Sequence, residues 1–135
     1  MSAETKKIKV LMSKISLDGH WRGLSLVATT LRDAGMEVVW GGLMTADQIV
    51  EAAIQEDVGV IGLNVGSRYG VIRDLMKILR EREIDDMLVV VGGTIPPGDI
   101  PALKEMGVDG VFPPGSDLDS IARIIKEKVR DRSSN

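Results

Sequence analysis

Residues 58–64 have the sequence VGVIGLN, which is apolar along nearly its whole length. A strand with one face in solvent alternates apolar and polar residues, whereas a continuous apolar run indicates a strand that is covered on both faces. Residues 87–91, MLVVV, show the same pattern and are followed by Gly92 and Gly93. Shorter apolar runs complete a set of five predicted strands, at 8–13, 37–40 and 109–112.

Segments with apolar residues at helical spacing alternate with these strands. We predict helices at 22–34, 45–56, 67–82, 96–106 and from 116 onward. Thr45 and Ser116 are placed to cap two of these helices at their N-termini. In the helix that Thr45 caps, the residues expected to face the core are Ile49, Val50, Ala53 and Ile54.

A strand followed by a helix, repeated five times, predicts an α/β fold with a parallel sheet and helices on both faces. Because the crossovers between parallel strands are right-handed, few topologies are possible. We predict the flavodoxin-like (Rossmann-like) strand order 2-1-3-4-5. Residues 1–135 would then form a single domain, with its core at about residues 8–130.

The composition excludes several classes of function. The chain has a formal net charge of -3 at pH 7, and its basic residues form no stripe apart from nearby acidic ones, so we expect no binding to nucleic acid. It has no cysteine, which excludes disulfides, thiolate metal sites and cysteine nucleophiles. It shows neither a signal peptide nor the roughly 20 apolar residues of a membrane span, so we expect a cytoplasmic protein with no membrane partner.

The segment after the first strand, Lys14-Ile-Ser-Leu-Asp18-Gly-His20-Trp-Arg-Gly23, contains the one histidine of the chain. Ligands of such sheets bind at the carboxyl ends of the strands, where this segment begins. Imidazole is a common ligand for transition metals, and Asp18 is near enough in sequence to accept a hydrogen bond from its second nitrogen. Lys14 could hold that carboxylate. Gly19 lets the loop bend, and Gly23 lets the following helix approach a bulky ligand. The alternative is a solvated histidine in a polar loop.

One histidine does not make a zinc site, which needs three or four protein ligands. A single protein ligand suits a metal that a macrocycle already holds. Small residues also follow the third strand, at Gly62-Leu-Asn64-Val-Gly66-Ser67, and the fourth, at Gly92-Gly93. Together they predict a slot in which a flat or long ligand reaches the backbone, although each glycine alone is explained by a turn.

Asp18-Gly-His20-Trp-Arg-Gly23 resembles the Asp-x-His-x-x-Gly signature of cobalamin (vitamin B12)-binding domains. Lys14 and the Gly92-Gly93 pair also match that family, and the resemblance runs from about Ile8 to Val129. The chain is most similar to the cobalamin-binding domain or small subunit of methylmalonyl-CoA mutase and related acyl-CoA mutases.

The resemblance implies that His20 replaces the cofactor's dimethylbenzimidazole as the lower ligand of cobalt. It implies that Asp18 and Lys14 support His20, and that Gly92 and Gly93 belong to a slot for the displaced nucleotide tail. The other residues that it places beside the cofactor are Gly19, Trp21, Arg22, Gly23, Asn64, Gly66 and Ser67.

The chain departs from the family at two of these places. Asn64 and Gly66 stand where the family usually has serine and leucine. Asn64 still offers a hydrogen bond to the tail, but Gly66 lacks the apolar contact of leucine. We therefore expect a loose slot and weak binding by the isolated chain, unless a neighbour such as Tyr69 fills the space. Trp21 stands where the mutases commonly have aspartate, which points to a contact with the corrin or a partner, or to packing within the loop.

By this resemblance the chain is the small subunit of an adenosylcobalamin-dependent isomerase that rearranges the carbon skeleton of an acyl-CoA. A separate large subunit would bind the substrate, so no catalytic residue is expected on this chain and it would be inactive alone. The alternative is a corrinoid carrier or delivery protein, which usually adds an N-terminal helical cap. A signalling receiver domain has the same fold but needs an aspartate after the third strand, where this chain has Asn64.

Overall fold

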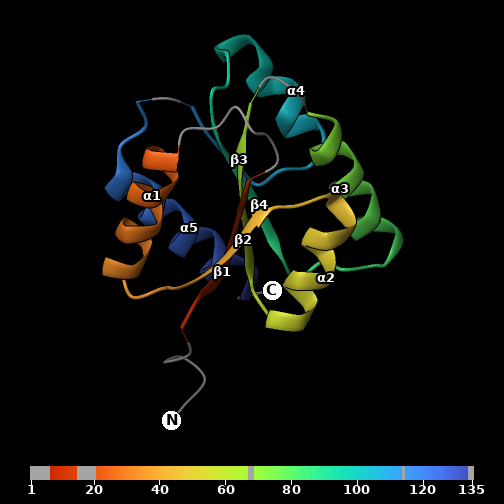
Figure 1. The fold of residues 1–135 in the computed structure, drawn as a ribbon, viewed down its shortest axis with the longest axis horizontal. Coiled ribbons are helices and arrows are strands. Elements are labelled where there is room, and N and C mark those ends of the chain that lie inside the picture. Colours follow the sequence, from red (N-terminus) through yellow and green to blue (C-terminus); the bar gives the residue numbers. More distant parts are fainter. Residues whose placement is uncertain (1–6, 15–20, 67–68, 114, 134–135) are drawn as a thin grey trace.

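The computed structural model describes residues 7–14, 21–66, 69–113 and 115–133, and for residues 21–24 and 133 it describes the backbone alone. Its centre is a five-stranded parallel sheet in the order β2-β1-β3-β4-β5, which confirms the predicted fold and strand order (Figure 1). The strands are β1 (Lys9–Lys14), β2 (Glu37–Leu43), β3 (Val60–Val65), β4 (Leu88–Gly93) and β5 (Gly110–Phe112).

Helices cover both faces of the sheet, as the continuously apolar strands require. One face is covered by α1 (Trp21–Asp33) and α5 (Leu118–Ser133) (Figure 1). The other face is covered by α2 (Ala46–Glu56), α3 (Gly70–Glu81) and α4 (Ile100–Glu105), which follows the short 3-10 helix η2 (Pro97–Asp99). No helix in the described part of the chain is both long and apolar enough to cross a membrane.

Each face of the sheet has its own core because side chains alternate along a strand. Leu11, Ile61 and Val89 pack toward α2 and α3. Val10, Val60 and Val90 pack toward α1 and α5. The α1 and α5 side also holds the candidate site.

Two N-terminal helix caps were predicted; the structure confirms one and contradicts the other. Thr45 caps α2 in a capping box, in which its hydroxyl accepts from the Gln48 N–H at 3.3 Å and its own N–H donates to the Gln48 side chain at 3.0 Å. Ser116 does not cap α5, since its hydroxyl donates to the Pro113 carbonyl oxygen at 2.6 Å. Asp117 accepts from the Ser120 N–H at 3.1 Å and caps the helix instead.

Three other predictions are corrected. Ile54 of α2 is 40% exposed rather than buried, because it lies at the edge of the apolar stripe. β2 continues beyond Trp40 to Leu43, since Ser13 and Lys14 of β1 pair with Gly42 and Leu43. α3 begins at Gly70 rather than at residue 67.

Candidate functional site

The predicted site residues of the first loop are only partly described. Asp18, Gly19 and His20 lie outside the described residues, as does Ser67 after β3. The backbone of Trp21, Arg22 and Gly23 forms the first turn of α1. The 15–20 segment therefore joins the carboxyl end of β1 directly to the start of α1.

Lys14 is the last residue of β1 and pairs with Asn64 on the neighbouring β3. It is only 5% exposed, which is unusual for lysine. A buried ammonium group is stable when acidic or other acceptor groups surround it. Lys14 thus puts a positive charge at the carboxyl edge of the sheet, where the 15–20 segment begins.

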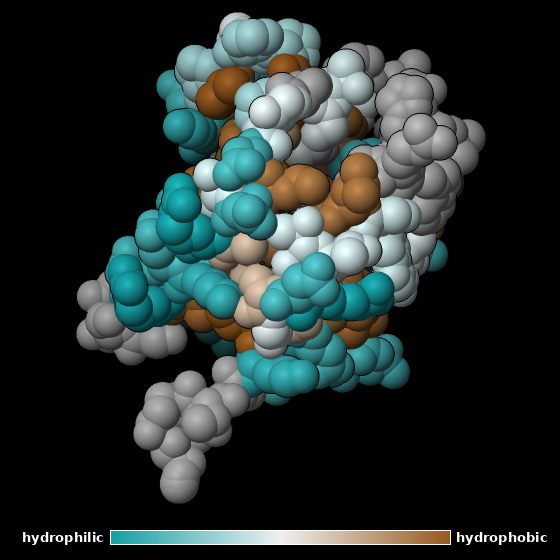
Figure 2. Space-filling model, turned by 90° about the vertical axis from the view of Figure 1, so that its left-hand side faces the viewer, coloured by the Kyte–Doolittle hydropathy of each residue, from teal (hydrophilic) through white to brown (hydrophobic). Residues whose placement is uncertain are grey.

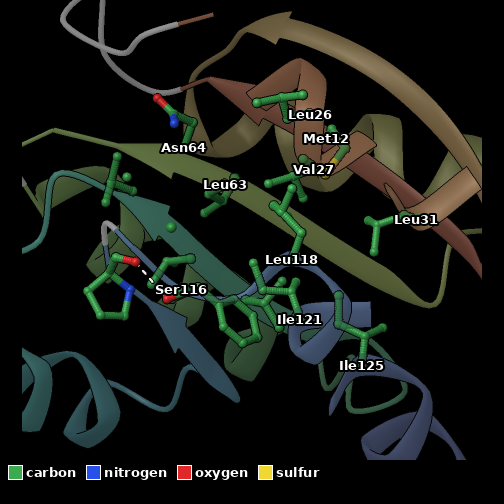
Figure 3. A pocket seen from close by; sticks show the side chains of 18 of the residues that line it. Met12, Leu26, Val27, Leu31, Leu63, Asn64, Ser116, Leu118, Ile121 and Ile125 are labelled. Carbon is green, nitrogen blue, oxygen red and sulfur yellow. Dashed lines mark hydrogen bonds between the residues drawn. The ribbon is translucent and has the colours of Figure 1, made fainter. Parts of the chain in front are cut away.

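A cavity of about 400 Å³ opens between the sheet and the two helices α1 and α5 (Figure 3). Its walls come from β1, β3, β4 and β5, from apolar side chains of α1 and α5, and from the loop that leads into α5. This volume is within the range of pockets that hold small organic ligands. Figure 2 views the molecule from the α1 side and shows apolar atoms at the surface among hydrophilic ones.

Three glycines of the sheet line the cavity, namely Gly62, Gly92 and Gly93. A Cβ at Gly92 would lie 3.3 Å from the Phe112 carbonyl oxygen, and one at Gly93 would overlap the Val65 carbonyl oxygen. Gly93 also has a φ of +123°, which side chains disfavour. Gly92 and Gly93 were predicted to follow the fourth strand, but they are its last two residues and pair with Asn64 and Val65.

Asn64 is the polar side chain of β3 that lines the cavity, at the carboxyl end of the strand (Figure 3). Its Oδ1 is buried and has no hydrogen-bond partner within the described structure. Leaving a buried acceptor unpaired costs about 1–3 kcal/mol, and such groups are normally paired in folded proteins. A ligand or a neighbouring segment that brings a donor to this end of the cavity would satisfy the oxygen.

Gly66 and Tyr69 lie away from the described wall of the cavity. Gly66 is buried after β3 but is absent from the described residues that line the cavity. Tyr69 packs against the core on the opposite face of the sheet and donates a hydrogen bond to Asp99 at 2.7 Å. It therefore does not fill this cavity, and the missing leucine does not open the described wall.

Burial, together with the hydrogen bond and the charge of Asp99, raises the pKa of Tyr69 to about 12. The phenol is protonated at neutral pH in any case, and the raised pKa extends its hydrogen bond to Asp99 into alkaline solution. Two hydrogen bonds link the segments that follow β3 and β4. One is the Tyr69 to Asp99 bond, and in the other the Thr94 N–H donates to the Val65 carbonyl oxygen at 3.3 Å. Both connections lie at the carboxyl edge of the sheet beside Asn64.

The helix walls of the cavity were not predicted from the sequence. Val27 and Leu31 of α1 and Ile121 and Ile125 of α5 line it, together with Ser116. Their spacing is that of any core-facing stripe, so periodicity alone does not distinguish a cavity wall from a packed core.

Replacing Gly93 by alanine should damage both the fold and the cavity. The new methyl group would meet the Val65 carbonyl oxygen at a positive φ, and strained backbone of this kind costs roughly 1–3 kcal/mol. We expect the thermal unfolding midpoint to fall by about 5 °C or more. The matched control is Gly98→Ala, because a Cβ at Gly98 would meet no atom within 4 Å. Equal unfolding midpoints for the two variants would show that the fold tolerates a side chain at position 93.

The chain is similar to curated small subunits of two mutases. It is 42% identical over 125 residues to the 2-hydroxyisobutanoyl-CoA mutase small subunit of Aquincola tertiaricarbonis, covering 87% of this chain and 92% of that protein. It is 39% identical over 125 residues to the pivalyl-CoA mutase small subunit of Xanthobacter autotrophicus, covering 91% and 84%. It is also 32% identical to the methylmalonyl-CoA mutase large subunit of Streptomyces virginiae, of which it spans 18%.

Solved structures agree on the fold. A cobalamin-binding protein from Desulfitobacterium hafniense matches 90% of this chain and 59% of its own with a TM-score of 0.75 at 19% identity. The receiver domain of NarL from Mycobacterium tuberculosis matches 93% of this chain with a TM-score of 0.72 at 15% identity. A cobalamin-binding protein and a receiver domain match this structure about equally well. The fold therefore does not decide the family, which is assigned from sequence similarity.

The sequence pattern of the B12 binding domain matches residues 8–123, which include β1 to β5 and the cavity between them and α1. With the two small subunits above, this match covers most of the chain. The chain therefore belongs to the B12-binding domain family.

Proposed function

We propose that this chain is the cobalamin-binding small subunit of an adenosylcobalamin-dependent acyl-CoA mutase. The observation that carries the proposal is the cavity beside the carboxyl ends of β3 and β4, whose lining includes Asn64 with its unpaired oxygen. Asn64 pairs with Lys14, the residue that precedes the segment carrying His20 in the sequence. The nucleotide tail would lie in this cavity.

His20 would bind cobalt, while Asp18 would accept a hydrogen bond from its other ring nitrogen. Such a partner fixes the tautomer and raises the basicity of the ligand. The buried Lys14 ammonium group would in turn stabilise the Asp18 carboxylate at the end of β1. Gly19, Trp21, Arg22 and Gly23 would border the corrin from the loop and the first turn of α1, and Gly66 and Ser67 from the end of β3.

Within the cavity, Gly92 and Gly93 would let the tail approach the backbone of β4 closely, and Asn64 would offer its amide as a polar anchor. Adenosylcobalamin, when bound, supplies a cobalt–carbon bond whose cleavage starts the rearrangement. The residues of this chain would hold the cofactor, orient it and keep water from its tail.

The acyl-CoA substrate would bind to a separate large subunit. Two relatives of which this chain covers 92% and 84% are both named as small subunits of acyl-CoA mutases. We therefore propose a two-component isomerase in which this chain is inactive alone.

Titration of the purified chain with cobalamin tests the binding function. We expect saturable binding and the absorption spectrum of histidine-ligated cobalamin. Asp18→Ala should weaken binding on the order of 10–100-fold, the usual effect of removing a residue that orients a metal ligand. The control is Asp33→Ala, the same change at an exposed position near the end of α1. If Asp18→Ala and Asp33→Ala bind cobalamin with equal affinity, Asp18 does not support the metal ligand.

A further inference from the structure

Two helices on the face of the sheet opposite the cavity begin at residues that are bonded to each other. Tyr69 precedes α3 and Asp99 precedes α4, and within the described structure neither side chain caps its own helix. An aspartate before a helix often accepts a hydrogen bond from the N–H two or three residues on. The Asp99 carboxylate instead accepts from the Tyr69 hydroxyl at 2.7 Å. This carboxylate therefore joins two elements rather than stabilising its own helix.

The surroundings of this hydrogen bond favour its persistence. It is partly buried, and it joins residues 30 apart in the sequence. Tyr69 and Ile100, the neighbour of Asp99, both pack against the core cluster under α2 and α3. A hydrogen bond to an ionised carboxylate is stronger than one between neutral groups, and partial burial limits competition from water. The bond can therefore hold the starts of α3 and α4 together.

The connections that follow β3 and β4 are joined at a second point. The Thr94 N–H donates to the Val65 carbonyl oxygen at 3.3 Å, where the two strands end. One hydrogen bond thus joins the connections at their beginnings, and the bond between phenol and carboxylate joins them at the helix starts. Two bonds at different points leave the connections little freedom to move apart. They lie at the edge of the sheet where ligands of this fold bind.

The joined connections continue directly from the backbone that carries Asn64. Asn64 and Val65 pair with Gly92 and Gly93, and a Cβ at Gly93 would lie 3.4 Å from Nδ2 of Asn64. Tyr69 is absent from the described lining of the cavity, as is its partner. An effect of the hydrogen bond on a ligand there would therefore pass through the ends of β3 and β4.

We propose that Tyr69 and Asp99 are positioning residues, which hold the connections after β3 and β4 in the arrangement that binds the cofactor. The inference rests on the proposed cobalamin binding and adds two residues outside the cavity on which affinity depends. An edge that is ordered before binding loses less entropy when the ligand arrives. Without the hydrogen bond the free chain populates other arrangements, and the apparent affinity falls in proportion to the fraction that remains competent to bind.

Tyr69→Phe tests the proposal, because it removes the hydroxyl and keeps the ring in the core. In titrations of the full chain with cobalamin we expect an affinity about 3- to 10-fold lower. Amide hydrogen exchange of the free variant should rise in peptides that include Tyr69 and also in those that include Asp99. Saturation with cobalamin should return both to the exchange of the unchanged chain.

Variants of the acceptor distinguish the hydrogen bond from other effects of the ring. Asp99→Ala should lower the affinity as Tyr69→Phe does, whereas Asp99→Asn keeps an oxygen for the phenol and should restore most of the affinity. Because the two residues act through one bond, the double variant Tyr69→Phe with Asp99→Ala should bind no more weakly than either single variant. A double variant that loses the product of the two single effects would overturn the shared role.

Asp109→Ala is the matched control for general loss of stability. Asp109 accepts a hydrogen bond from the Val89 N–H at 2.9 Å, near the amino end of β4. Its removal should lower the unfolding midpoint and leave the affinity for cobalamin unchanged. Equal losses of affinity in Asp109→Ala and Asp99→Ala would overturn the positioning role, as would an unchanged affinity in Tyr69→Phe. In both cases cobalamin binding by the unchanged chain would stand, whereas its absence would overturn the proposed function itself.

Discussion

Replacing His20 by alanine should abolish the histidine-ligated spectrum of bound cobalamin. The chain has a single histidine, so no second imidazole can take its place. We also expect a larger loss of affinity than the 10–100-fold effect of removing Asp18, because a direct bond to the metal is lost rather than its support. The measurement is an absorption titration of the variant and the unchanged chain with cobalamin.

Free imidazole provides the control for a general defect in folding. Added to His20→Ala, it should restore part of the ligated spectrum if the loop and cavity are otherwise intact. A thermal unfolding midpoint of the variant close to that of the unchanged chain would show that the fold is intact. A variant with an unaltered spectrum would remove His20 from the metal.

The second large effect concerns the partner. The chain and its cognate large subunit, mixed with adenosylcobalamin, should together rearrange an acyl-CoA, whereas neither protein alone should do so measurably. In the proposed two-component enzyme the cofactor and the substrate are held by different chains, so a reaction between them requires both. The measurement is product formation at a fixed concentration of large subunit and increasing amounts of this chain.

Saturation of the rate with added chain would support a stable complex. Equal turnover by the large subunit without this chain would contradict the two-component enzyme. Tight cobalamin binding without any turnover in the mixture would favour the corrinoid carrier instead. Val38→Thr is a control for general damage to the fold. It alters the partly buried inner face of β2 in the α1-side core but not the described cavity lining, so turnover in the mixture should be retained.

The strand order could be predicted because it depends on features that local sequence carries. Continuous apolar runs such as 58–64 and 87–91 separate parallel strands from helices, and the handedness of crossovers then limits the topology. The Thr45 cap could also be predicted, since Gln48 completes its capping box. The cap of α5 could not, because Ser116 and Asp117 are both good capping residues and the choice depends on the Pro113 carbonyl oxygen.

The cavity could be predicted only at its glycine side. Gly92 and Gly93 are conspicuous in the sequence, and the structure shows them against the cavity. Leu31 and Ile125 have the same spacing as residues of a closed core, and the gap between them depends on how α1 and α5 pack on the sheet. The role predicted for Tyr69 was wrong for a similar reason, since its partner Asp99 is 30 residues away in the chain.

The most direct test of the account is electron paramagnetic resonance of the cobalt(II) form of cobalamin bound to the chain. An axial nitrogen ligand of natural isotope splits each cobalt line into three, whereas nitrogen-15 splits it into two. Because the chain has one histidine, growth on histidine with nitrogen-15 in its ring labels His20 alone. The account predicts that the three-line pattern becomes a two-line pattern in the labelled protein. A three-line pattern that persists would show that the base of the nucleotide tail still holds the cobalt, and it would contradict both the ligand and the placement of the tail in the cavity.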